Sequence, residues 1–170
     1  HPFTCRVSDV DVTKRTASAH WLELTEDDIV IFPGRQHYLE GTFDPSSVPM
    51  YGTSLGFSDI AMKHLTSVLR FSLTGEGQHI KYIRISSRCG SPLSGTFRMG
   101  TDINGCFDGS ITPYGTASLP SSVILDCGGT VQLGPDPAYF YAAIPHGAYP
   151  EGFCAQVISD DGNSMNLYFM

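Results

Sequence analysis

Charged residues are scarce in this chain, and basic ones especially so. Lys and Arg together number 10 against 17 Asp and Glu, which gives a formal net charge of −7 at pH 7. Phosphate binding requires clustered Lys and Arg, so we expect no nucleic-acid partner. There is also no apolar run of the roughly 18 residues that a transmembrane helix needs. The chain opens His1-Pro2-Phe3-Thr4-Cys5 without a signal-peptide pattern, so we expect a mature form or an excised domain.

Metal-binding and cofactor-binding motifs are missing as well. The six histidines show no H-x-H or H-E-x-x-H spacing, and no C-x-x-C motif occurs. We therefore expect no metal and no cofactor. Three cysteines in strand-like runs are predicted to be small buried hydrophobic residues, namely Cys5, Cys127 and Cys154. Two others in turn-like surroundings, Cys89 and Cys106, would pair only in an oxidising compartment.

The composition instead favours many short strands joined by turns. Hydrophobic residues make up 41% of the sequence, with 18 Gly and 11 Pro as frequent interruptions. At 170 residues we expect one domain spanning residues 1–170. Apolar and polar residues alternate with a period of two from end to end, which predicts strands near residues 3–12, 28–32, 38–43, 64–73, 80–86, 93–99 and 121–127. Thr13 to His20 is predicted to be a polar loop.

The last third of the chain carries the clearest strand pattern. Three apolar runs, Tyr139 to Ile144, Phe153 to Ile158 and Met165 to Met170, are separated by turn residues. Asp161-Gly162 between the last two predicts a hairpin with a type I′ turn. Tyr139 to Ile144 is apolar on both faces, which predicts a strand central to its sheet and favours a sandwich.

Only one enzyme motif occurs. Gly52-Thr53-Ser54-Leu55-Gly56 matches G-x-S-x-G, and His146 and Asp136 would supply the remaining residues of a triad. The run before it, Val48 to Tyr51, is short and broken by proline, and alternating strand and helix units are missing. We therefore expect no enzymatic activity and no catalytic residues.

Several strand-like segments resemble the fimbrillin family of pilus subunits. They are Lys63 to Leu73, Ile80 to Ile85 and Pro92 to Phe97, and the stretch from Tyr139 to Met165 resembles the end of that family's N-terminal domain. The resemblance implies a transthyretin-like antiparallel β-sandwich of the Greek-key type. It also implies an extracellular location on the surface of a Gram-negative anaerobe, at the outer membrane or in a pilus, where other pilus subunits are the partners.

The resemblance further implies assembly by β-strand addition after proteolysis at an arginine. Arg15, in the polar loop after the first strand, is the candidate processing site. The strand that would be exchanged contains Phe3, Cys5 and Val7. The chain stops near the end of the family's first domain and lacks the lipid-attachment cysteine. An alternative function is a standalone carbohydrate-binding or protein-binding surface domain, in which Trp21, Tyr38 or Tyr114 would contact the ligand.

Overall fold

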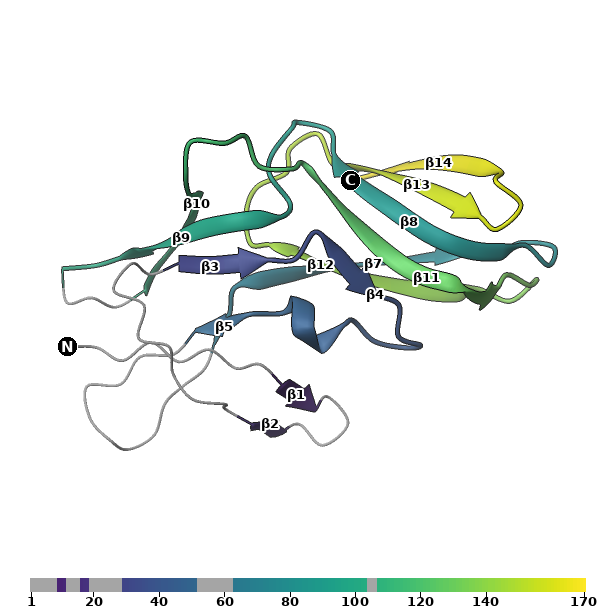
Figure 1. The fold of residues 1–170 in the computed structure, drawn as a ribbon, viewed down its shortest axis with the longest axis horizontal. Helices are drawn as coiled ribbons and strands as arrows, with labels where there is room; N and C mark the ends of the chain where they lie inside the picture. Colours follow the sequence, from purple (N-terminus) through teal and green to yellow (C-terminus); the bar gives the residue numbers. More distant parts are fainter. Residues whose placement is uncertain (1–8, 12–15, 19–28, 52–62, 104–106) are drawn as a thin grey trace.

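The fold is known from a computed structural model, which describes residues 9–11, 16–18, 29–51, 63–103 and 107–170 (Figure 1). Within these ranges the chain is all-β, as predicted, and one short 3-10 helix, η1 (Pro45–Ser47), is present. The strands are β1 (Asp9–Asp11), β2 (Thr16–Ser18), β3 (Ile29–Phe32), β4 (Arg35–His37), β5 (Met50–Tyr51), β6 (Lys63–His64), β7 (Thr66–Leu73), β8 (His79–Ser87), β9 (Gly95–Thr101), β10 (Phe107–Pro113), β11 (Ser122–Gln132), β12 (Ala138–Pro145), β13 (Phe153–Ser159) and β14 (Ser164–Phe169).

The largest sheet has five strands in the order β14-β13-β8-β11-β4. Its pairings are antiparallel except for β4, which runs parallel to β11. Side chains alternate strictly between the two faces, because neighbouring residues in a strand point to opposite sides. In β13, for example, Phe153, Ala155 and Val157 are buried, whereas the residues between them are partly exposed.

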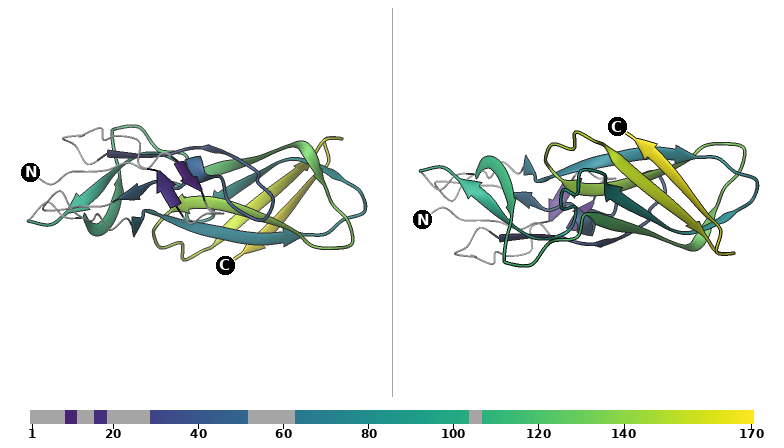
Figure 2. Two further views of the ribbon diagram at one scale, coloured as in Figure 1. Left: turned by 90° about the horizontal axis from the view of Figure 1, so that it is seen from below. Right: turned by 90° about the horizontal axis from the view of Figure 1, so that it is seen from above.

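The second layer is a two-stranded sheet of β7 and β12 that lies against this buried face (Figure 2). Phe140, Ala142 and Ile144 of β12 pack with Ile83 and Ile85 of β8 in a single hydrophobic core. All five side chains are at most 1% exposed. The result is a sandwich-like core, whose burial supplies the main favourable free energy of folding.

A continuous row of aromatic rings crosses this core from one side to the other. Starting from Tyr38, successive ring centroids lie 5.3, 5.6, 5.9, 5.7 and 4.9 Å apart along Phe140, Phe71, Phe169, Phe153 and Tyr149. These separations are typical of favourable aromatic pairs. The contact between Phe71 and Phe169 joins β7 to β14, so it closes one side of the sandwich.

The other side is closed by a buried amide. Gln36 in β4 is 1% exposed. Its Nε2 donates to the carbonyl oxygen of Ala143 at 2.6 Å, and its Oε1 accepts from the N–H of Ala143 at 2.9 Å. The side chain thus satisfies the backbone groups of Ala143 that face away from β7. It bonds to the free edge of β12 as a neighbouring strand would.

This arrangement corrects the prediction for Tyr139 to Ile144. The segment forms β12 but is not central to its sheet, because β7 is its one partner strand among the described residues. Ala143 is buried because it lies beside the Gln36 amide. The apolar pattern arises from a tertiary contact rather than from a second flanking strand.

A smaller sheet with the order β10-β9-β3 extends one end of the molecule. It has its own apolar cluster, in which the Phe32 and Phe97 rings meet edge to face at 5.1 Å. Two further pairs, β1-β2 and β5-β6, are antiparallel. Because Thr16–Ser18 pairs with Asp9–Asp11, the predicted loop from Thr13 to His20 contains a strand.

The terminal hairpin is confirmed, but its turn differs from the predicted one. The N–H of Gly162 donates to the Ser159 carbonyl, and the N–H of Ser159 donates to the Asn163 carbonyl. This pattern defines a three-residue loop in which Gly162 adopts φ +83°. Glycine is favoured there because positive φ places the Cβ of other residues too close to the backbone.

Two predicted segments change their boundaries. Tyr38 to Phe43 is not a strand, because a tight turn forms between Leu39 and Thr42. The predicted strand end at Cys127 is also wrong, because β11 continues to Gln132 through a bulge. Before the bulge Asp126 lies opposite Tyr82, and after it Val131 lies opposite Ile80. Gly128 and Gly129 adopt positive φ within this bulge.

We predict that Gln36→Leu destabilises the fold by about 2–4 kcal/mol, because it leaves the N–H and C=O of Ala143 buried without partners. Gln132→Leu, at an exposed position, should change stability by about 0.5 kcal/mol or less. Urea unfolding of both variants at equal protein concentration measures the difference. Equal midpoints would contradict the proposed role of Gln36.

Candidate functional site

The residues predicted to take part in processing and strand exchange cannot be placed. Arg15, Phe3, Cys5 and Val7 lie outside the described residues. The same is true of Trp21 and of the Gly52 to Gly56 motif. The strand that precedes this motif is the two-residue β5, which pairs with the equally short β6.

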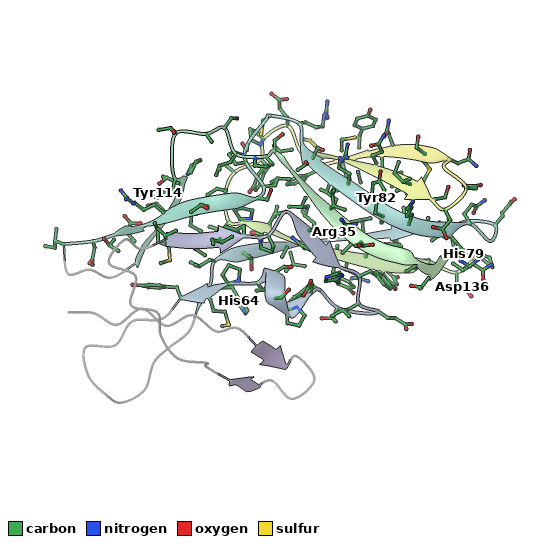
Figure 3. All side chains as sticks on the ribbon, viewed as in Figure 1. Arg35, His64, His79, Tyr82, Tyr114 and Asp136 are labelled. Atoms are coloured by element: carbon green, nitrogen blue, oxygen red, sulfur yellow. The ribbon has the colours of Figure 1, made fainter. Side chains whose placement is uncertain are left out.

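The structure does not bring together Asp136 and His146, the other two residues of the catalytic triad that the motif would require. Asp136 precedes β12 and His146 follows it, so an eight-residue strand separates them. At about 3.3 Å per residue, this corresponds to ~26 Å. The Nδ1 of His146 instead lies 3.4 Å from the Ser67 hydroxyl. Figure 3 shows Asp136 at the end of the molecule where His79 lies.

The most distinctive surface feature is the contrast between the two edges of the five-stranded sheet. At one edge, β4 has three residues, Arg35, Gln36 and His37. Arg35 is further held by an ion pair with Asp126 at 2.9 Å. At the other edge, β14 has six residues, Ser-Met-Asn-Leu-Tyr-Phe, with no charge and no proline. Short or charged edges resist pairing with other chains, whereas a longer uncharged edge favours it.

The hydrogen-bonding pattern identifies which backbone N–H and C=O groups of β14 point away from β13. Ser159 and Asn163 form the bonded pair that closes the hairpin. Because bonded and non-bonded pairs alternate in an antiparallel ladder, the backbone groups of Ser164, Asn166 and Tyr168 point away from β13. In the described part of the chain, β13 is the one strand that pairs with β14.

A second surface feature is a cleft of about 530 Å³ near the end of β11. Its walls are the turn after β4, the end of β11 beyond the bulge, and the start of β12. Tyr38, Glu40, Thr130, Gln132 and Tyr139 line it. Tyr38 is one of the ligand contacts that the sequence predicted for the alternative function. The others were missed because three separate segments contribute them, and no local pattern links those segments.

A smaller cleft of about 310 Å³ lies between the loop that joins β7 to β8 and the terminal hairpin. Its floor is apolar, with Ile80, Leu133 and Val157. These are core side chains that the end of the sandwich leaves reachable from solvent. No charged group other than Glu76 belongs to its described lining.

Asp44 positions the turn that forms one wall of the larger cleft. Its carboxylate accepts from the N–H of His37 at 2.9 Å and from the N–H and hydroxyl of Ser46 at 3.0 and 2.7 Å. Burial by itself would raise the pKa of Asp44. The hydrogen bonds from Ser46 and His37 outweigh that effect and hold the pKa below its ordinary value.

The described cysteines are free thiols with contrasting surroundings. Cys127 is buried, as predicted, and burial raises the pKa of its thiol to about 12. Cys89 lies between the hydroxyls of Ser87 and Ser91, each 3.1 Å from its sulfur. These hydrogen bonds lower the pKa of Cys89 to about 7. Cys154 is partly exposed, and Cys5 and Cys106 lie outside the described residues.

In the ranges that the structure describes, no three His, Cys, Asp or Glu side chains converge in a group that could hold a metal ion. No helix in those ranges has the length and apolar character needed to span a membrane.

Comparison with known proteins identifies no relative of this chain. No protein family, no curated protein and no solved structure matches it.

We predict that Asp44→Asn lowers stability at neutral pH by about 1–3 kcal/mol, because an amide cannot accept all three hydrogen bonds. The pKa of Asp44 is lower in the folded state than in the unfolded state. Its contribution is therefore complete above the unfolded pKa of about 3.9 and is lost as the pH falls through the folded pKa.

The difference in unfolding free energy between the two proteins should therefore shrink on acidification. Urea titrations between pH 7 and the acid limit of folding measure this difference. Asp136→Asn, at an exposed position, is the matched control and should show no such trend. A difference that stays constant with pH would contradict the role of the Asp44 carboxylate.

We also predict a clear order of thiol reactivity. Alkylation at pH 7 should modify Cys89 well before Cys127, because the thiolate is the nucleophile. Peptide mapping by mass spectrometry reads each site separately. The double variant Ser87→Ala/Ser91→Ala should slow the reaction at Cys89 by removing the hydrogen bonds that favour its thiolate. Equal rates for Cys89 in both proteins would contradict this account.

Proposed function

We propose that this chain is a structural or adhesive subunit domain of a cell-surface fimbria. In this proposal it is not an enzyme and assembles with other subunits by β-strand addition. The transthyretin-like Greek-key topology, the extracellular location and the processing site at Arg15 belong to the same proposal. They rest on the resemblance to fimbrillins that the sequence suggests.

The observation that carries the proposal is the uncharged edge strand β14. A strand from another subunit can form a ladder with the outward N–H and C=O groups of Ser164, Asn166 and Tyr168. Tyr168 is 66% exposed and Met165 is 46% exposed, so the edge also offers apolar surface. The Arg88 guanidinium lies 5.7 Å from the Tyr168 ring centroid.

Strand addition at β14 would leave the sandwich core intact. Leu167 and Phe169 already pack inward against the core, and Phe169 stacks on Phe71 and Phe153. The ladder with β13 holds the strand in register over its whole length. An incoming strand therefore meets a preformed template and need not order this edge, which lowers the entropic cost of association.

The alternative function is a standalone surface domain that binds a carbohydrate or a protein. The two functions differ in self-association. A pilus subunit domain should form oligomers that depend on protein concentration or on trypsin-like cleavage at Arg15, whereas a standalone binding domain should remain a monomer under both conditions.

The test compares the natural chain with Asn166→Pro and Asn166→Lys by sedimentation and electron microscopy, before and after limited trypsin cleavage. Proline at an outward-facing edge position removes an N–H that β13 does not use. Lysine introduces the charge that edge strands commonly carry. We expect both variants to fold and to lose assembly, while Thr116→Lys, in an exposed turn, assembles as the natural chain does.

Hydrogen exchange gives a residue-level check. In the assembled protein the amides of Ser164, Asn166 and Tyr168 should become protected relative to the monomer. If the natural chain stays monomeric with and without cleavage, the proposal is wrong. It is also wrong if Asn166→Lys assembles as readily as the natural chain.

A further inference from the structure

The cleft lined by Tyr38, Glu40, Thr130, Gln132 and Tyr139 has the size and shape of a small-ligand site. Its volume of about 530 Å³ falls within the range of about 300–1,000 Å³ that is common for such sites. The backbone features that shape it are a turn with φ +74° at Gly41 and the glycine bulge in β11.

The walls of the cleft combine two tyrosines with several hydrogen-bonding groups. The Tyr38 ring packs against the ring of the core residue Phe140, with 5.3 Å between the ring centroids. Tyr139 also lines the cleft and is 42% exposed. Tyrosine presents a rigid apolar ring and a polar hydroxyl, and little side-chain entropy is lost when a ligand contacts it.

The hydrogen-bonding groups of the cleft are mostly acceptors with capacity to spare. Glu40 lies at the corner of the turn, where its carboxylate can accept from ligand hydroxyls. Thr130 donates its hydroxyl hydrogen to the Cys127 carbonyl at 3.0 Å, and this bond leaves the oxygen able to accept a further hydrogen bond. Gln132 donates through Nε2 to Gly77 at 3.4 Å, which leaves its carbonyl oxygen available.

The charges narrow the class of ligand. Glu40 is the one charged residue among the described residues that line the cleft, so the lining itself offers no cation to pair with an anion. A cation is disfavoured at Tyr139, because the Arg70 guanidinium already lies 4.4 Å from the centre of that ring. A neutral ligand rich in hydroxyl donors fits both constraints. Its C–H surface can pack on tyrosine while its hydroxyls donate to the acceptors.

We propose that this cleft binds the terminal unit of a neutral saccharide, with the face of the Tyr139 ring turned away from Arg70 as its platform and the Glu40 carboxylate as its main acceptor. The inference goes beyond strand addition and does not depend on it, since the cleft shares no residue with β14.

The test uses the ¹⁵N-labelled 170-residue chain and four uncharged probes, the methyl glycosides of glucose, galactose, mannose and N-acetylglucosamine. N-acetylneuraminic acid is the anionic comparison. We expect at least one neutral glycoside to shift the amide signals of Glu40, Thr130, Gln132 and Tyr139. Tyr139→Ala and Glu40→Gln should each weaken this binding by about tenfold or more, since a hydrogen bond to a charged group or a lost aromatic contact has that size.

Two tyrosines outside the cleft serve as matched controls. Like Tyr139, each lies beside an arginine: Tyr168 beside Arg88, and Tyr114 beside Arg98 at 4.5 Å. Figure 3 shows Tyr114 at the opposite end of the molecule from Asp136, which directly precedes the cleft residue Pro137. We expect Tyr168→Ala and Tyr114→Ala to bind as the natural chain does.

Three results would overturn the proposal. They are no shift at the cleft amides with any of the four glycosides, shifts with N-acetylneuraminic acid alone, and binding that Tyr114→Ala abolishes while Tyr139→Ala does not. The assembly-deficient Asn166→Lys variant should still bind the glycoside. Failure of this inference is therefore distinguishable from failure of the proposed strand addition.

Discussion

The architecture depends on one buried side-chain amide. Gln36 bonds both backbone groups of Ala143, and through them it joins β4 and the five-stranded sheet to the edge of β12. Hydrophobic contact holds the two layers together elsewhere but does not fix their lateral position, because apolar contacts lack direction. The two hydrogen bonds of the Gln36 amide are directional, so they fix the position of β12 relative to β4. On the opposite side, the sandwich is closed by the stack of Phe71 on Phe169.

The two edges of the five-stranded sheet therefore differ in length, in charge and in the elements that contact them. The edge strand β4 is short, carries charge and is hydrogen-bonded to β12 through Gln36. The turn after β4 forms one wall of the cleft that Tyr38 and Tyr139 line. The β14 side is longer, uncharged and held only by β13 among the described strands. In the two proposals made above, the saccharide cleft and the edge that accepts a strand share no residue, so that occupation of one would not obstruct the other.

Much of the secondary structure could be predicted from the sequence, because alternation of apolar and polar residues is a local property. The three terminal strands, the strand beginning near His64 and the all-β class follow from it. The position of β12 at a sheet edge could not be predicted, because its second neighbour is a side chain 107 residues away. Gly128 and Gly129 were predicted to follow the end of a strand, whereas they form a bulge within β11. Glycine occurs both at strand ends and in bulges, so the local sequence does not distinguish the two. The cleft depends on three distant segments, so no window of sequence contains it.

The span of the contact between Gln36 and Ala143 has a consequence for biosynthesis. The two partners are 107 residues apart, and β4 pairs with β11 across a similar stretch. Loops of that length close slowly, and folding that relies on them is delayed. A nascent chain cannot complete this core until Ala143 has been translated. The apolar side chains of β7 and β8 are therefore synthesised before β11 and β12, against which they pack.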